Sequence, residues 1–168
     1  MTSPAPRNAV RPRQPVLRST VLPLLGLLVA LAVIRLLIVT PVSVHGVSME
    51  PTVYAGIAFV ARWPDPAELE RGQLVVVHDP QGTLSLKRVV GLAGDRVAIR
   101  DAVLEVDDRV VVEPYVDASR IDGTYFGPVT IPRGTLFVMG DNRGSSIDSR
   151  DYGPVDLDRV FGTVLVAW

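Results

Sequence analysis

Residues 74–90 read LVVVHDPQGTLSLKRVV, which is two short apolar, β-branched runs separated by turn-forming residues. Runs of this length and composition are typical of β-strands, and the Asp-Pro pair at 79–80 is a strong turn signal. We therefore predict strands at 74–78 and 84–90. The rest of the chain is interpreted outward from this pair.

The same alternation of short strands and turns continues on both sides of residues 74–90. Seven further strands are predicted at 42–47, 57–61, 96–99, 103–106, 110–113, 135–139 and 160–166. Helical periodicity after residue 41 is limited to a possible turn at 67–71. The stretch 113–133 is rich in Pro, Gly and Asp, and indicates an insertion or a loop-rich excursion. The chain of 168 residues therefore has room for one mainly β domain.

A long apolar run, VLPLLGLLVALAVIRLLIVT, occupies residues 21–40 and contains Arg35 as its single charge. Twenty helical residues at about 1.5 Å each span the roughly 30 Å core of a bilayer. We expect a transmembrane helix, with the Arg35 side chain reaching the interface. A cleaved signal peptide and a buried soluble helix are the alternatives. The run is longer than a signal-peptide core, and residues 40–44 are not a small-x-small cleavage site.

Charge changes sign along the chain, with four arginines in residues 1–20 and no acid before Glu50. The positive-inside rule then predicts a cytoplasmic tail at 1–20, a membrane helix at 21–40 and an extracytoplasmic domain at 41–168. The expected location is the cell membrane, with a single crossing.

Composition excludes several classes of function. Beyond residue 40 there are twelve basic residues and eighteen acids, and a mildly acidic domain without a basic stripe is a poor nucleic-acid binder. The chain has no cysteine, which excludes a disulfide framework, a zinc–thiolate site and a cysteine nucleophile.

The first segment that carries chemistry is GVSMEPT at 46–52, a few residues after the apolar run. At no more than about 3.6 Å per residue, the chain keeps Ser48 within roughly 30 Å of the membrane surface. A serine beside glycine and proline is most often an ordinary turn residue, so this segment alone leaves both a turn and a nucleophile open.

The second segment is LSLKRVVG at 84–91, which contains Lys87, the only lysine among seventeen basic residues. A sequence that prefers arginine so strongly uses it wherever a permanent charge suffices, whereas only lysine can lose its proton when it is desolvated. Lys87 is therefore a candidate base in an apolar site, or a strand charge on the surface.

The third segment is MGDNRGSSIDSRDYG at 139–153, which follows a predicted strand and combines turn formers, hydroxyls, arginines and acids. Such a loop is either a solvated connection or a hydrogen-bonded support for a site.

Taken together and in this order, the three segments resemble the bacterial type I signal peptidases. The matching residues are Ser48-Met49-x-Pro51-Thr52, Lys87-Arg88-Val89-x-Gly91 with Gly94-Asp95-x-Val97, and Gly140-Asp141-Asn142 to Asp148-Ser149-Arg150. The resemblance covers the apolar run and residues 42–166. It implies a membrane-anchored serine protease whose catalytic domain is a coiled antiparallel β-sheet. Within that domain, residues from about 100 to 135 are implied to form a hairpin and a reduced accessory β region.

The resemblance also implies roles for individual residues. Ser48 is the implied nucleophile, and Lys87 is the implied general base. The supporting residues are Ser146, which orients the lysine, Asp148 and Arg150 as an ion pair, and Asp141 with Asn142 as a structural turn. The walls of the substrate pockets are implied at Val44, Met49, Val53 and Leu86.

Three positions depart from the family pattern. Gly46 stands where some members have a serine that helps to hold the oxyanion, so the backbone N–H of Ser48 is expected to hold it here. Ser85 replaces an aromatic residue two positions before the lysine, and Asp107-Asp108 replaces a frequent Asn-Gly.

The implied chemistry requires a lysine that is neutral near pH 7, although an ordinary lysine has a pKa of about 10.4. Burial lowers that pKa, and we expect Arg88 to assist if its charge points nearby. No metal or organic cofactor is needed. His45 is an alternative base, but a three-residue offset from Ser48 places the two side chains on opposite faces of a regular strand.

The implied substrates are signal peptides of exported preproteins, cut after a small-x-small motif, and the implied partners are the lipid bilayer and, by proximity, the export machinery. Two rival hypotheses remain: another Ser/Lys processing protease on the same scaffold, and a non-catalytic, membrane-tethered β binding module.

Overall fold

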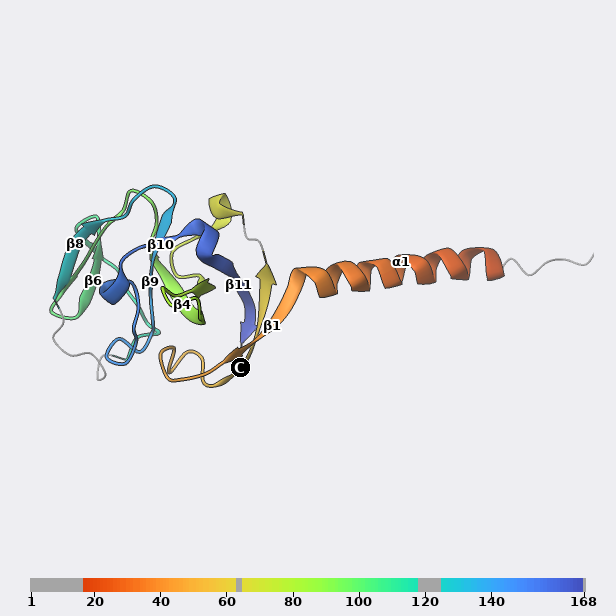
Figure 1. The fold of residues 1–168 in the computed structure, drawn as a ribbon, viewed down its shortest axis with the longest axis horizontal. Coiled ribbons are helices and arrows are strands. Elements are labelled where there is room, and N and C mark those ends of the chain that lie inside the picture. Colours follow the sequence, from red (N-terminus) through yellow and green to blue (C-terminus); the bar gives the residue numbers. More distant parts are fainter. Residues whose placement is uncertain (1–16, 63–64, 118–124, 168) are drawn as a thin grey trace, which may run out of the picture. The chain divides into compact units, whose positions relative to one another are not determined.

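The computed structural model describes residues 17–62, 65–117 and 125–167. The chain divides into two units, residues 1–37 and 38–168. The first contains the helix α1 (Leu17–Ile38) and the second is mainly β (Figure 1).

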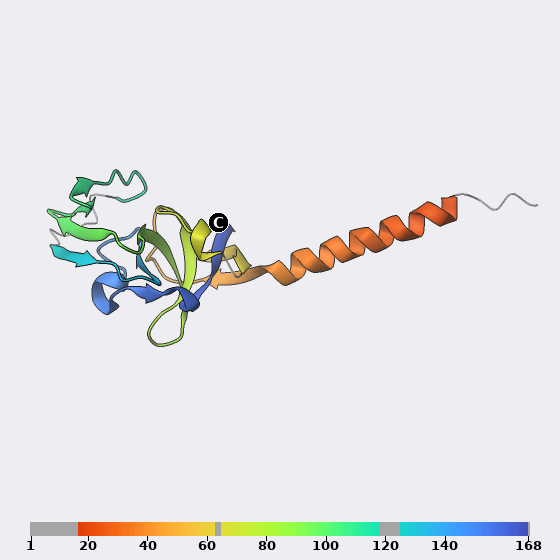
Figure 2. The same ribbon diagram turned by 90° about the horizontal axis from the view of Figure 1, so that it is seen from above.

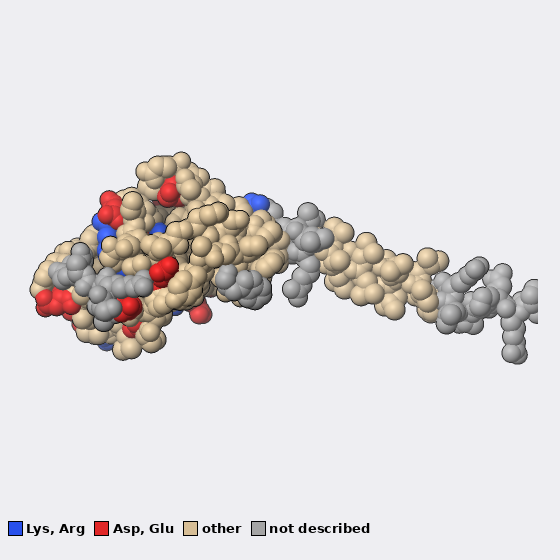
Figure 3. All heavy atoms as spheres, turned by 90° about the horizontal axis from the view of Figure 1, so that it is seen from below, with Lys and Arg blue, Asp and Glu red and all other residues tan. Residues whose placement is uncertain are grey.

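Helix α1 covers most of the apolar run but ends at Ile38, so Val39 and Thr40, predicted to belong to the membrane helix, begin strand β1 (Val39–Val44) instead. Its described side chains, residues 20–33, are exposed, and Figure 3 shows them without acidic or basic atoms. Counting only residues whose placement is described, no helix has the length and apolarity that a membrane crossing requires. Of the basic tail predicted at 1–20, residues 1–16 lie outside the described part of the chain. The side chain of Arg35 is also not described.

A seven-stranded antiparallel sheet forms the larger part of the β domain, in the order β1-β2-β11-β3-β4-β9-β10 (Figures 1 and 2). Its strands are β1 (Val39–Val44), β2 (Gly56–Arg62), β3 (Leu74–His78), β4 (Leu84–Gly91), β9 (Thr135–Met139), β10 (Val155–Asp156) and β11 (Val160–Ala167). Strand β4 is flanked by β3 and β9, so its backbone is paired on both edges.

A smaller antiparallel sheet has the order β7-β6-β5-β8. It consists of β5 (Arg96–Arg100), β6 (Val103–Val106), β7 (Arg109–Val110) and β8 (Phe126–Thr130). Three short helical segments complete the described part of the domain: the 3-10 helices η1 (Pro66–Glu68) and η3 (Leu157–Arg159), and α2 (Ser149–Tyr152).

Three apolar clusters fill the domain, and two of them use opposite faces of the larger sheet. Val76 of β3 belongs to the cluster that includes Leu86, whereas its neighbours Val75 and Val77 belong to the cluster that includes Val89. This follows from the two-residue repeat of a strand. The third cluster joins the two sheets through Phe137 of β9.

Most predicted strands are present with bounds within a few residues, and three predictions are wrong. The strand expected at 42–47 ends at Val44, and the one expected at 110–113 ends at Val110. The stretch 113–133, predicted to be irregular, contains β8. Its sequence FGPVT conceals the strand because Gly and Pro are depleted in strand interiors, but β8 lies at the sheet edge, where the missing N–H of proline is tolerated.

We expect Phe137→Ala to lower the free energy of unfolding by about 3–5 kcal/mol. Phe137 is fully buried between the sheets, with its ring centroid 5.4 Å from that of Phe126. Urea unfolding in detergent, followed by circular dichroism, measures the loss. The matched control is Val112→Ala at an 83% exposed position, which should change stability by less than about 0.5 kcal/mol. Equal losses in the two variants would contradict the assigned core.

Candidate active site

Ser48 lies in a tight turn that follows β1. The N–H of Glu50 donates to the carbonyl of Val47 at 3.2 Å, and the N–H of Val53 donates to that of Met49 at 2.9 Å. Met49 is 1% exposed and anchors the turn in the core, while Ser48 remains partly accessible. Within the described residues the N–H of Ser48 has no acceptor, so it is available to a ligand.

The loop after β9 holds this turn from the other side. Asn142 donates its backbone N–H to the carbonyl of Ser48 at 3.0 Å and its side-chain amide to the carbonyl of Val47 at 3.0 Å. A Cβ at Gly140 would collide with the Ser48 carbonyl and the Ser146 hydroxyl. Glycine at 140 therefore permits the two serines to approach the same point of the backbone.

Lys87 lies in the middle of β4 and is 3% exposed. It pairs with Val75, and opposed residues of an antiparallel pair lie on the same face, so Lys87 shares the face of Val75 and Val89. Burial lowers the pKa of Lys87, whereas the more distant carboxylates of Asp148 and Asp79 oppose this effect. In the described part of the chain, its amine has neither a hydrogen bond nor an ion pair.

One cavity of about 500 Å³ is lined by both Ser48 and Lys87. The serine enters from the turn after β1, and the lysine from the middle of the sheet. No hydrogen bond joins their side chains among the described residues. Hydrogen bonds of catalytic pairs are often long before substrate binds, so the absence of one here does not exclude Lys87 as a candidate base for Ser48.

His45 lines the same cavity as Ser48, which corrects the prediction that the two side chains lie on opposite faces of a strand. The reason is that β1 ends at Val44, so the alternation of a regular strand does not extend to Ser48. His45 is exposed, in contrast to the buried Lys87.

Asp148, fully buried, is the centre of the loop that faces the cavity. It accepts hydrogen bonds from Arg150 Nε and Nη2, both at 2.9 Å, and from the N–H of Gly140 at 3.0 Å. It also caps α2. The Ser146 hydroxyl, predicted to orient the lysine, is buried without a hydrogen-bond partner among the described residues.

Arg88 does not contribute to the lowered pKa of Lys87, contrary to the sequence-based expectation, because neighbours on a strand face opposite sides of the sheet. Its guanidinium forms two hydrogen bonds to Asp141, at 2.8 and 2.6 Å, and stacks on Tyr115 at 3.7 Å from the ring centroid. Asp141 is thus more than a turn residue, since it ties the loop to β4. The charge that helps to lower the pKa of Lys87 is that of Arg150.

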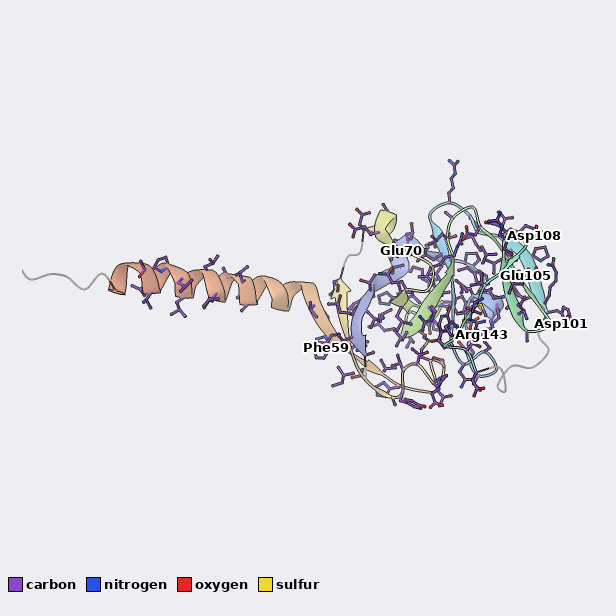
Figure 4. All side chains as sticks on the ribbon, turned by 180° about the vertical axis from the view of Figure 1, so that it is seen from behind. Phe59, Glu70, Asp101, Glu105, Asp108 and Arg143 are labelled. Carbon is purple, nitrogen blue, oxygen red and sulfur yellow. The ribbon has the colours of Figure 1, made fainter. Side chains whose placement is uncertain are left out.

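Arg143 forms a second buried ion pair, which the sequence analysis did not anticipate. It donates to both carboxylate oxygens of Glu113 at 2.6 Å and to the Gly140 carbonyl at 3.1 Å. Figure 4 shows Arg143 within the body of the domain, away from the acids Asp101, Glu105 and Asp108 at the edge of the smaller sheet. The partner Glu113 lies in an irregular stretch, which gave no signal of this contact.

A second cavity, of about 290 Å³, adjoins Ser48 and is flanked by β1 and β4. Of the four predicted pocket walls, Val44 and Leu86 line it. Met49 and Val53 lie buried in the same apolar cluster as these two and do not line a described cavity.

Among the lining residues of the larger cavity that the sequence did not single out, two have ionisable side chains, Asp79 and Tyr152. Asp79 was interpreted as a turn signal only, and its Oδ1 does accept the N–H groups of Gln81 at 3.0 Å and Thr83 at 2.8 Å. Tyr152 belongs to the third segment, but the spacing of residues in that segment did not predict the short helix α2 that brings Tyr152 to the cavity.

The family model described as signal peptidase, peptidase S26, matches residues 17–168. The signal peptidase I of Bacillus licheniformis is 37% identical over 144 residues, which cover 77% of this chain and 76% of that protein. The signal peptidase IB of Staphylococcus aureus is 34% identical over 154 residues, with 81% of each chain covered.

A solved structure is also similar. The crystal structure of a signal peptidase I from Enterococcus faecalis aligns with a TM-score of 0.53 and 29% identity, and covers 59% of this chain and 97% of that one. Because the family model matches residues 17–168 and relatives are more than 30% identical over most of their length, this chain belongs to the signal peptidase family, peptidase S26.

Proposed function

We propose that this protein is a membrane-bound serine endopeptidase that removes signal peptides from exported preproteins after a small-x-small motif. The observation that carries the proposal is that the only lysine of the chain is buried in the cavity that Ser48 also lines. The names of the similar proteins support the same reaction class.

In the proposed mechanism, Lys87 in its neutral form accepts the proton of Ser48 while the serine oxygen attacks the scissile carbonyl. For this step, Ser48 Oγ and Lys87 Nζ must close to about 2.6–3.2 Å. The lysine ammonium then returns the proton to the departing amine, which leaves an acyl-enzyme. A water molecule hydrolyses this ester after the same lysine accepts its proton.

The backbone N–H of Ser48 holds the oxyanion in this mechanism. Gly46 carries no side chain to assist, and its φ of +85° favours glycine over other residues. A fixed backbone donor is well suited to this role, because it is already oriented when charge develops on the carbonyl oxygen.

The smaller cavity suits the residues before the cleaved bond. Its volume of about 290 Å³ is small, and strands β1 and β4 flank it with Val44 and Leu86. An extended peptide placed between these strands presents alternate side chains to the wall. We therefore assign small side chains of the substrate to this cavity, with Met49 and Val53 forming the layer behind it.

The apolar run at 21–40 is proposed to anchor the catalytic domain at the bilayer, with the basic tail in the cytoplasm. This places Ser48 close to the membrane from which a signal peptide emerges. The proposed partners are the signal peptides of preproteins, the lipid bilayer and, by proximity, the export machinery.

We expect Ser48→Ala and Lys87→Ala each to reduce preprotein cleavage by at least about 10³-fold, since each removes a group that takes part in the proton transfer. Incubation of the detergent-solubilised protein with a preprotein, followed by N-terminal sequencing of the product, measures this. His45→Ala is the matched control, because it removes a side chain from the same cavity without removing the proposed base. Full activity of Lys87→Ala would end the dyad mechanism.

On the acid limb of the profile of kcat/KM against pH, we expect the midpoint to lie at a pH below the ordinary pKa of lysine. The reason is that burial lowers the pKa of Lys87. Activity should fall as pH drops through that pKa, since the amine becomes protonated. The carboxylate of Asp79 raises the pKa of Lys87, so Asp79→Asn should move the acid limb to lower pH. Asp101→Asn, at an exposed position outside the cavity, should leave it in place. A shift to higher pH in Asp79→Asn would contradict the assignment.

The absence of cysteine makes the membrane topology directly testable. Ser3→Cys in the tail and Val112→Cys in the domain each introduce a single thiol, and Val112 is 83% exposed. We expect a membrane-impermeant maleimide to label only the Val112→Cys variant in intact cells, and both variants after lysis. Labelling of the tail in intact cells would reverse the proposed orientation.

A further inference from the structure

Tyr152 has a hydroxyl that the mechanism above does not use. The hydroxyl is buried and has no hydrogen-bond partner among the described residues. Leaving a buried polar group unpaired costs about 1–3 kcal/mol, so such a group in a native protein requires an explanation. Its position at the end of α2 is well determined, because the Tyr152 N–H donates to the Asp148 carbonyl at 3.2 Å.

Three observations place Tyr152 and Lys87 in the same region of the domain. Tyr152 and Lys87 line the same cavity. Tyr152 also packs against the apolar cluster that contains Val75 and Val89, which is the face of the sheet that Lys87 shares. The third observation is that Asp79, Asp148 and Asp151 are electrostatic neighbours of both side chains.

The hydrogen-bonding groups of the lysine amine explain why a second hydroxyl would help to orient it. A neutral amine has two N–H donors and one lone pair. As a base it must direct the lone pair to Ser48, which requires acceptors for both N–H groups. Ser146 Oγ and Tyr152 Oη are two buried hydroxyl oxygens without partners in the described part of the chain. Neither is hydrogen-bonded to Lys87 in this structure, so a shift of the lysine side chain is needed for the two oxygens to accept from both N–H groups.

We propose that Tyr152 is a positioning residue for Lys87: its hydroxyl oxygen accepts a hydrogen bond from Lys87 Nζ and thereby turns the lone pair of the neutral amine to Ser48. Tyr152 does not touch the substrate in this role and acts only through the lysine. The proposal rests on the proposed function of the Ser48 and Lys87 pair.

The charged groups that act on the two side chains come from three parts of the domain: the turn after β3, α2 with its cap, and η3. The carboxylates are Asp79 from the turn between β3 and β4, and Asp148 and Asp151 from α2 and its cap, while the cations are Arg150 and Arg159. None of these charges is altered by removal of the Tyr152 hydroxyl. A change in the titration of Lys87 after that removal therefore reports the hydroxyl itself.

Tyr152→Phe removes only the hydroxyl and keeps the ring in its apolar contacts. We expect kcat for preprotein cleavage to fall roughly 10-fold to 100-fold, which corresponds to a lost hydrogen bond to a charged group, while KM stays within about 2-fold. The acid limb of the pH profile should move to lower pH, because the ammonium form of Lys87 loses an acceptor. Tyr125→Phe is the matched control, with the same atom removed from an exposed ring outside the cavity.

The titration of Lys87 can be followed without activity, because lysine-selective isotope labelling of this chain gives a single side-chain signal. We expect the signal in Tyr152→Phe to titrate at lower pH than in the unaltered protein. Thermal unfolding of the variant should remain cooperative, which shows that a loss of activity does not arise from a loss of the fold.

The outcomes separate the two proposals. An unchanged kcat and an unchanged Lys87 titration in Tyr152→Phe would overturn the positioning role while leaving the peptidase function intact. A lower kcat without any shift in the titration would also overturn it, because it would indicate a merely structural role. If the unaltered protein does not cleave preproteins, the proposed function fails, and the titration of the lysine signal still decides whether Tyr152 contacts Lys87.

Discussion

The burial of one amine on a central strand is the constraint on which the candidate site depends. Water stabilises an ammonium strongly, so its exclusion around Lys87 disfavours the charged form and lowers the pKa of the side chain. The carboxylates of Asp148 and Asp79 work against this effect from a distance. If either formed a direct ion pair with the amine, the proton would be retained and the base would be lost. In the described residues, Asp148 is engaged by Arg150 instead, which keeps it a distant influence.

The fold supplies this environment by bringing three separate segments to one strand. Strand β4 has a paired neighbour on each edge and an apolar cluster on each face, so its centre is shielded from solvent. Arg88, which faces away from Lys87, binds Asp141 and so attaches the loop after β9 to the same strand. Asn142, next in sequence, then holds the turn that carries Ser48. Adjacent residues of β4 thus have separate roles: Lys87 is the proposed base, and Arg88 fixes the loop that holds the turn of the proposed nucleophile.

Local patterns were sufficient to predict most strands and to single out Lys87, because short β-branched runs and a lone lysine are visible in the sequence itself. The role of Ser48 followed from the resemblance of three segments to one family, and Asp79 and Tyr152 of the same cavity were not predicted. The errors occur where tertiary contacts override local signals. Strand β8 contains Gly127 and Pro128 and is stabilised by its position at the sheet edge. The sequence left open whether the charge of Arg88 points to Lys87, and the structure shows that it binds Asp141 instead. The contact of Arg143 with Glu113 joins residues thirty positions apart, which spacing alone does not reveal.

Gly46 illustrates how one departure from the family pattern follows from backbone geometry. No atom lies within 4 Å of the point where a Cβ would be placed, so space does not exclude a side chain there. The φ of +85° does, since residues with a Cβ rarely adopt it. A serine at this position would require a different conformation of the turn. The side-chain donor that some members use and the backbone donor assigned to Ser48 are therefore alternative solutions, and the conformation of residue 46 selects between them.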